Sequence, residues 1–232
     1  MKLSISSNVA FSQKCNPHLL LHHRAWRGDR RGAQCRTSGH AGRGLKGGRR
    51  SVLHQGQYMN GQVTQGLMAG KRGLIMGLAN DRSLAWGIAK ELADAGAELA
   101  FSYQGEALAK RVAPLAQQLG SDFLIDCDVS DMDALDRTFE ELKARWETID
   151  FVVHAVGFSD KNELRGKFVD TSLDNFLLTM NISAYSFVAV TRRARAMMPN
   201  GGSVLTLSYY GAEKVIPHYN VMGVAKAALE TS

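Results

Sequence analysis

Residues 73–87 read GLIMGLANDRSLAWG, and this stretch decides which fold we expect for the rest of the chain. Gly73 to Gly77 is a short apolar run between glycines, which is typical of a strand buried on both faces of a parallel sheet. Ser83 then stands where a helix would begin, and apolar residues follow it at helical spacing. The stretch therefore predicts a strand, a glycine turn and a helix.

The same unit recurs along the chain. Further strands are predicted at residues 97–103, 122–127, 149–156 and 202–208, and further helices at 106–119, 131–146, 173–198 and 219–232. Strands that alternate with helices at this spacing specify an α/β fold, because right-handed crossovers place helices on both faces of one parallel sheet. We therefore expect a doubly wound parallel sheet.

Residues with ligand-binding chemistry fall at the predicted strand ends. Gly77, Gln104, Asp128, Gly157 and Ser208 each stand at or just after the end of a successive strand. Open parallel sheets bind their ligands at the carboxyl ends of the strands. The pattern predicts a nucleotide site along this edge.

The glycine turn would hold a pyrophosphate, although it lacks the G-x-G-x-x-G fingerprint. Gly77 would let the chain turn without a side chain, Ser83 offers a hydroxyl and an amide at a helix start, and Gly87 would permit close packing of the helix. The second strand ends at the neutral Gln104, so charge alone does not decide between NAD and NADP.

Charge divides the chain into two domains. Residues 1–67 carry 11 Lys and Arg against the single acid Asp29, which leaves 17 basic and 21 acidic residues for 68–232. The first segment is expected to be a basic, disordered extension or a mis-assigned start, with Met59 or Met68 as the true first residue. An organellar targeting segment and an RNA-binding tail are its alternatives.

The remaining composition narrows the class of protein. Three cysteines without paired spacing indicate neither a disulfide framework nor a zinc site, and a reducing cytoplasm fits them. No apolar run approaches the length of a membrane helix. We expect a cytoplasmic protein without a metal, and neither nucleic acid nor membrane as its partner.

The segment after the fifth predicted strand carries the catalytic signal. Lys226 follows Tyr219 by seven residues, Tyr209 precedes Tyr219 by ten, and Gly223 stands four residues after Tyr219. This pattern resembles the enoyl-[acyl-carrier-protein] reductases, a divergent branch of the short-chain dehydrogenase/reductase family. Residues 77–87, 97–104, 127–129, 154–158 and 205–229 are similar to that family's segments in the same order, so the resemblance extends from Met68 to the end.

The resemblance implies a Rossmann fold, incomplete at the C-terminus, and a set of site residues. The catalytic set would be Tyr209, Tyr219 and Lys226, and the backbone at Ser159 would line the acyl pocket. The cofactor NADH (NAD when oxidised) would contact Gly77, Ser83, Leu84, Gln104, Asp128, Val129, Val156 and Lys226.

The implied activity is NADH-dependent reduction of the trans-2-enoyl thioester carried by acyl carrier protein, in the elongation cycle of fatty-acid biosynthesis. The resemblance also implies a homotetramer for a full-length protein. Family members continue beyond the helix that holds Lys226, so we expect this 232-residue product to be truncated and inactive or poorly folded.

Two alternatives stay open. A carbonyl-reducing short-chain dehydrogenase/reductase would use the same cofactor, but its lysine normally follows the tyrosine by four residues, where this chain has Gly223. The interpretation as a noncatalytic, basic-tailed nucleic-acid-binding protein rests on residues 1–67 alone. His154 is interpreted as a structural strand histidine whose ring is hydrogen-bonded.

Overall fold

A computed structural model describes residues 58–59, 62–63 and 66–232, which belong to two separate compact units. In the smaller unit, β1 (Tyr58–Met59) pairs with β2 (Gln62–Val63) in an antiparallel manner. No strand is predicted there from the sequence. The other residues of the predicted 1–67 domain, except Gly66 and Leu67, lie outside the described residues.

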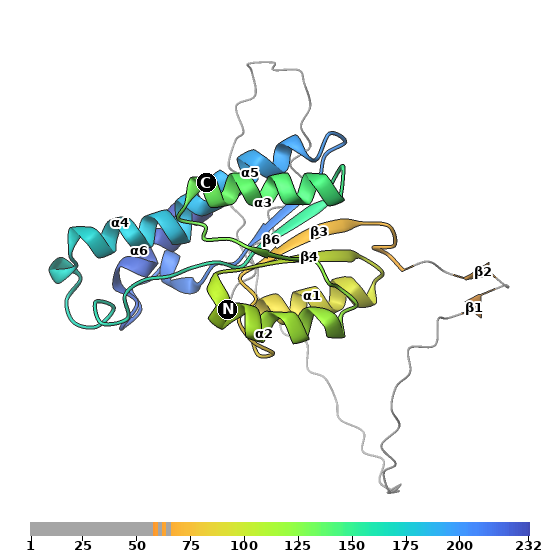
Figure 1. The fold of residues 1–232 in the computed structure, drawn as a ribbon. Helices are drawn as coiled ribbons and strands as arrows, with labels where there is room; N and C mark the ends of the chain where they lie inside the picture. Colours follow the sequence, from red (N-terminus) through yellow and green to blue (C-terminus); the bar gives the residue numbers. More distant parts are fainter. Residues whose placement is uncertain (1–57, 60–61, 64–65) are drawn as a thin grey trace, which may run out of the picture. The chain divides into compact units, whose positions relative to one another are not determined.

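Residues 66–232 form one parallel five-stranded sheet with the strand order β5-β4-β3-β6-β7 (Figure 1). Its strands are β3 (Arg72–Met76), β4 (Glu98–Tyr103), β5 (Leu124–Asp126), β6 (Phe151–His154) and β7 (Ser203–Thr206). Every adjacent pair is parallel. The predicted doubly wound sheet is confirmed, and the order reverses between β3 and β6, where such sheets bind ligands.

Helices cover both faces of the sheet, as Figure 1 shows. On one face lie α1 (Leu84–Asp94) and α2 (Gly105–Gln118), and on the other lie α3 (Met132–Arg145) and α5 (Ser186–Ala196). Two buried apolar clusters fill the layers, one around Phe101 and Leu78 and the other around Leu135 and Val190. Each central strand of the sheet is therefore buried on both faces, which explains its continuous apolar sequence.

The helix predicted at residues 173–198 is interrupted. It consists of α4 (Leu173–Met180), a π-helical turn (Asn181–Tyr185) and α5. In the turn, the Ser183 hydroxyl accepts from the Phe158 backbone N–H and donates to its carbonyl oxygen, both at 2.9 Å. These bonds join the turn to the segment after β6, and such π turns frequently occur at functional sites.

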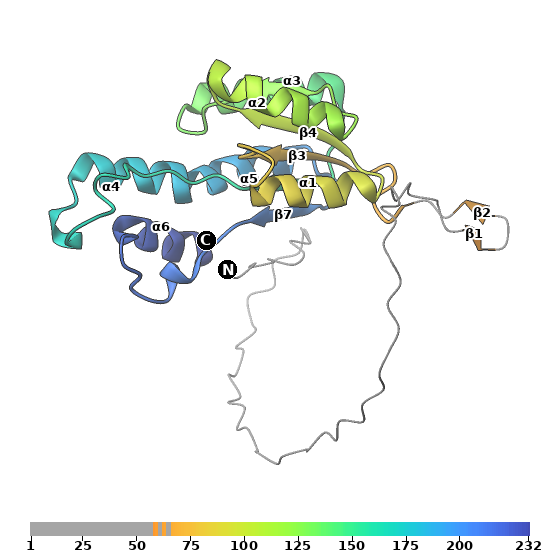
Figure 2. The same ribbon diagram turned by 90° about the horizontal axis from the view of Figure 1, so that it is seen from below.

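The last helix, α6 (Asn220–Glu230), lies beside α4 (Figure 2). Two short 3₁₀ turns precede it, η1 (Phe168–Asp170) and η3 (Tyr210–Ala212), and neither was predicted. Among the described residues, no helix has both the length and the apolar character needed to cross a membrane.

The expected role of Gly87 is wrong. Gly87 is exposed, and a β-carbon added there would meet nothing within 4 Å, so close packing does not require a glycine at this place in α1. The spacing from Gly77 suggested that Gly87 packs closely on a strand. A position in a helix does not by itself show which residues lie opposite it.

Candidate functional site

A cavity of about 550 Å³ opens at the carboxyl ends of β3, β4 and β5. Five residues that the resemblance assigned to the cofactor line it: Gly77, Gln104, Asp128, Val129 and Val156. The structure brings them together although they come from four separate turns of the chain. The cavity is thus built where the topology predicts a ligand site.

Gly77 stands where the ends of β3 and β6 approach each other closely. Its φ is +88°, and a β-carbon there would lie 2.2 Å from the Ala155 carbonyl oxygen. Any side chain would therefore collide with the backbone that follows β6, so only glycine lets the turn present bare backbone to the cavity.

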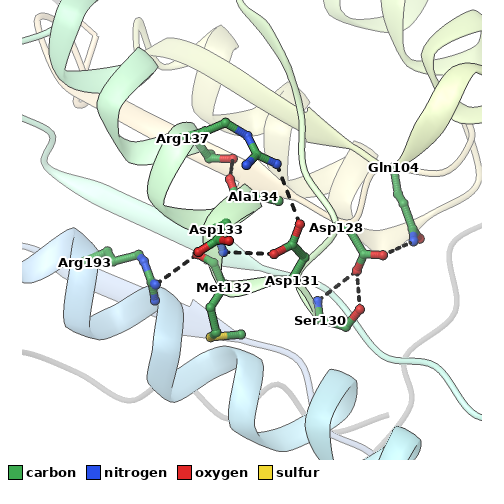
Figure 3. Close-up of polar contacts among 10 residues, drawn as sticks. Gln104, Asp128, Ser130, Asp131, Met132, Asp133, Ala134, Arg137 and Arg193 are labelled. Carbon is green, nitrogen blue, oxygen red and sulfur yellow. Dashed lines mark hydrogen bonds and ion pairs between the residues drawn. The ribbon is translucent and has the colours of Figure 1, made fainter.

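Hydrogen bonds hold a carboxylate and an amide at the end of β4 (Figure 3). Gln104 Nε2 donates to Asp128 Oδ2 at 2.7 Å, and the Ser130 backbone N–H and hydroxyl donate to Asp128 Oδ1 at 2.8 and 2.6 Å. Partial burial opposes ionisation of Asp128, but the bonds from Ser130 and Gln104 outweigh it and lower the pKa of this carboxyl. Asp128 is therefore ionised at neutral pH.

A second cavity, of about 410 Å³, adjoins the first at Val156 and Gly157, which line both. Its lining includes the three residues expected to be catalytic, Tyr209, Tyr219 and Lys226. The two cavities together form an elongated site that runs from the end of β4 to the start of α6.

The two tyrosines of the second cavity contact each other edge to face, with ring centroids 4.9 Å apart. Burial raises the pKa of Tyr219 to about 12, and the neighbouring Tyr209 adds to this effect. Tyr219 therefore keeps its phenol proton at physiological pH and can donate a hydrogen bond.

Lys226 is only 8% exposed, and its ammonium donates to the Leu207 carbonyl oxygen at 2.9 Å. Burial lowers its pKa, while the Glu230 carboxylate one helical turn later opposes the shift. Glu230 is itself held by the Ser208 hydroxyl. A β-carbon on Gly157 would lie 3.5 Å from the Lys226 ammonium, so the lysine lies against bare backbone.

The structure explains why the lysine does not follow Tyr219 by four residues. At that place, Gly223, a β-carbon would lie 2.8 Å from the Gly211 carbonyl oxygen in η3. A longer side chain has no room there, because α6 packs directly on the backbone of η3. The ammonium instead reaches the cavity from Lys226, further along the same helix.

The start of α6 is strained, which sequence reasoning missed. His218 and Asn220, on either side of Tyr219, have φ values of 61° and 29°, in the left-handed region that non-glycine residues rarely adopt. Asn220 Nδ2 donates to the carbonyl oxygens of Glu163 and Gly166 at 3.3 and 3.4 Å. Such strain gathers at functional sites, and no sequence pattern marked it here.

Three expected site residues lie outside the two cavities. Ser83 caps α1, accepting from the Trp86 backbone N–H at 3.3 Å and donating to the Asn80 carbonyl oxygen at 2.7 Å, and Leu84 is 40% exposed beside it. Ser159 is buried and accepts from the Thr179 hydroxyl at 2.8 Å. Sequence reasoning also missed Ser183, whose hydroxyl would stand 3.7 Å from a β-carbon on Gly157.

His154 is a fully buried strand residue, and both ring nitrogens have partners, as the sequence analysis expected. Nε2 lies 2.8 Å from the Ser186 hydroxyl and Nδ1 lies 3.3 Å from the Thr206 hydroxyl. Burial, with a smaller effect from Lys226, lowers its pKa to about 4.

In residues 66–232, no cluster of three or more His, Cys, Asp or Glu could hold a metal ion.

Comparisons with known proteins point to one family. A family model described as "Enoyl-(Acyl carrier protein) reductase" matches residues 77–232. The enoyl-[acyl-carrier-protein] reductase [NADH] 1 of Rhizobium meliloti is 65% identical over 167 residues, which are 72% of this chain and 61% of the relative. The chain therefore spans less than two thirds of this relative's length.

Solved structures are similar over the same region. An Anaplasma phagocytophilum enoyl-(acyl-carrier-protein) reductase in complex with NAD matches with a TM-score of 0.70 and 60% identity, covering 72% of this chain and 64% of that one. A Bacillus cereus enoyl-acyl carrier protein reductase with NADP+ and indole naphthyridinone matches with a TM-score of 0.70 and 48% identity, covering 72% and 66%.

Proposed function

Because the chain belongs to the enoyl-(acyl carrier protein) reductase family, we propose that it binds NADH and reduces the trans-2-enoyl thioester carried by acyl carrier protein. The reaction would serve the elongation cycle of fatty-acid biosynthesis. One observation carries the proposal: Tyr219 and the buried Lys226 line one cavity at the carboxyl edge of the sheet, and the lysine is excluded from the place it takes in carbonyl reductases.

The elongated site fits a dinucleotide. Bare backbone at Gly77 and Gly157 leaves room for a ligand that approaches the sheet edge closely, and a side chain at Gly77 would collide with Ala155. Gln104, Asp128 and Val129 would hold the adenosine half, and Val156 and Lys226 the nicotinamide half. Ser83 and Leu84, at the start of α1, would hold the pyrophosphate with the backbone N–H groups of that helix end.

When bound, NADH supplies the hydride that reduces the enoyl double bond. Negative charge then develops on the thioester oxygen, and that oxygen needs a hydrogen-bond donor. Tyr219 can supply its phenol proton for this bond, since its raised pKa of about 12 keeps the proton in place. Tyr209 borders the same cavity and would contact the acyl thioester. The backbone at Ser159, outside that cavity, would contact the acyl chain, as the resemblance implies.

Lys226 would have two roles: it would bind the dinucleotide, and it would stabilise negative charge on nearby oxygens. Its ammonium already donates to the Leu207 carbonyl oxygen, which fixes its position, and it has further N–H groups for ribose hydroxyls. Its positive charge near the cavity also favours negative charge on neighbouring oxygens.

We infer a homotetramer for the full-length protein, in the cytoplasm, with neither nucleic acid nor membrane as its partner. Exposed apolar side chains along α4, the π turn and α5 support subunit contacts there: Leu173, Leu177, Tyr185 and Val188. Several exposed apolar side chains on consecutive elements are typical of a protein–protein contact.

The test is oxidation of NADH, followed at 340 nm, with crotonyl thioester beside a 3-ketoacyl thioester, by a version of this chain extended to the length of the Rhizobium meliloti relative. We expect the extended version to turn over the enoyl substrate alone. Because the chain spans less than two thirds of the Rhizobium meliloti relative's length, NADH binding is measured in parallel by calorimetry. Reduction of the ketoacyl thioester, or failure to bind NADH, would contradict the proposal.

A further inference from the structure

Glu230, the last residue of α6, stands one helical turn after Lys226 and is fixed from outside the helix. The hydroxyl of Ser208 donates to its carboxylate Oε1. Ser208 is only 4% exposed, and it follows Leu207, whose carbonyl oxygen accepts from the Lys226 ammonium at 2.9 Å. Two consecutive residues just after β7 therefore hold a cation and a carboxylate that α6 carries four residues apart.

The Lys226 ammonium needs an opposite charge, because it is buried at the edge of the second cavity. A buried charge is costly unless a group of opposite sign offsets the loss of water. The carbonyl oxygen of Leu207 supplies a hydrogen bond but carries no net charge. Among the described residues that line this cavity, none is Asp or Glu. The compensating charge must therefore come from behind the cavity wall, where residues four apart on a helix are neighbours.

The other titratable groups around Lys226 are neutral at physiological pH. From β6, burial and to a smaller extent the nearby ammonium lower the pKa of His154 to about 4. From the segment after β7 and the start of α6, Tyr209 and Tyr219 line the same cavity, and burial raises the pKa of Tyr219 to about 12. Burial lowers the pKa of Lys226 itself, and the charge of Glu230 opposes that effect.

We propose that Glu230 is a positioning residue of the site: its carboxylate, held by Ser208, keeps the buried ammonium of Lys226 charged and in place. Glu230 lines neither cavity, so it acts on a ligand only through Lys226. The inference rests on the proposed function for its consequence, since that function makes Lys226 bind the nicotinamide ribose. The charge relation between the two residues depends on the contacts of α6 alone.

The experiment follows the titration of Lys226 itself, through the pH dependence of its Cε signal in NMR spectra of the 232-residue chain. The signal is assigned by its loss in Lys226→Met. Glu230→Gln removes the charge but keeps an oxygen that can accept from Ser208. Glu230→Asp keeps the charge on a shorter side chain. Glu106→Gln is the matched control, because it removes an exposed carboxylate four residues from a lysine, Lys110, on a different helix, α2.

We expect Glu230→Gln to move the Lys226 titration to lower pH, Glu230→Asp to move it less, and Glu106→Gln to leave it unchanged. Ser208→Ala, which releases the carboxylate into solvent, should also move it to lower pH, but by less than Glu230→Gln. NADH affinity is then measured by calorimetry at about pH 7 and about pH 9.5. Between these values it should fall about threefold to tenfold more in Glu230→Gln than in the parent chain, because Lys226 loses its proton earlier.

An unchanged Lys226 titration in Glu230→Gln, or an equal shift in Glu106→Gln, would overturn the inference. Equal shifts in Glu230→Gln and Glu230→Asp would also overturn it, because they would show an effect of side-chain shape without a role for charge. If Glu230→Gln does not fold, Ser208→Ala carries the test, and an unchanged titration there overturns the inference. A chain whose Lys226 titrates as expected but which binds no NADH would overturn the proposed function and leave the relation between Glu230 and Lys226 standing.

Discussion

The carbonyl oxygen of Gly211 lies 2.8 Å from the place that a β-carbon on Gly223 would occupy. This approach joins η3 to α6, and it sets where along the helix a lysine can reach the cavity. The Tyr219 ring also packs against Gly211, where a β-carbon would lie 2.4 Å from that ring. Backbone packing thus excludes a lysine at position 223, four residues after Tyr219.

Gly223→Ala should destabilise the chain by about 1–3 kcal/mol, since the added methyl group forces α6 away from η3. Gly87→Ala is the matched control, because Gly87 is an exposed helical glycine with open space around it. The control should raise the free energy of unfolding by about 0.5–1 kcal/mol. Urea unfolding measures both, and equal effects of the two changes would refute the packing argument.

In a version of the chain extended to its relatives' length, Tyr219→Phe should lower kcat for enoyl reduction by about 10²–10³, because the developing charge on the thioester oxygen loses its donor. Tyr209→Phe should cost less, since Tyr209 is partly exposed and adds no bond to that oxygen in our proposal. NADH affinity, measured by calorimetry, should stay unchanged in both. Because the pKa of Tyr219 is about 12, the rate should show no ionisation of this phenol below about pH 11.

Lys226→Met keeps most of the buried side-chain volume but removes the ammonium. We expect weaker NADH binding by about tenfold or more, as one charge-assisted contact to the ribose is lost. Thermal unfolding serves as the control for folding, because the change also removes the bond to Leu207. Undiminished NADH affinity in a folded variant would show that Lys226 does not hold the dinucleotide.

His154 should make stability depend on pH. Burial lowers its folded pKa to about 4 from an ordinary 6.5, so the folded state requires the neutral ring. The stability that this neutral ring contributes is complete above about pH 6.5 and is lost as the pH falls toward 4, by about 3 kcal/mol at most. Urea unfolding between these pH values should show a shallower decline in His154→Gln, and parallel curves would contradict this account.

Much of the fold could be predicted from the sequence. The apolar run ending at Gly77 predicted the central strand β3, and the spacing after Ser83 predicted α1, whose structure differs from the prediction only at its ends. The long helix after Leu173 was predicted without its π turn, because that turn depends on Ser183 bonding to Phe158, a contact across 25 residues. The local periodicity of the sequence does not reveal a contact between residues so far apart.

The candidate site was predictable in outline only. Strand ends at Gln104 and Asp128 indicated a shared edge, yet the bond between these side chains, and the one from Gly105 to Asp126, follow from the placement of β5 beside β4. The strained residues around Tyr219 had no signal in the sequence at all.

The sequence by itself determined the alternation of strands and helices and the class of residue at each strand end, because hydrophobic spacing directly reflects which side chains become buried. Only the tertiary structure decided that Gly77 and Gly223 cannot be replaced while Gly87 can, and which atom of Gln104 faces Asp128. These outcomes depend on the distance between segments far apart in the chain, and that distance is set when the layers pack.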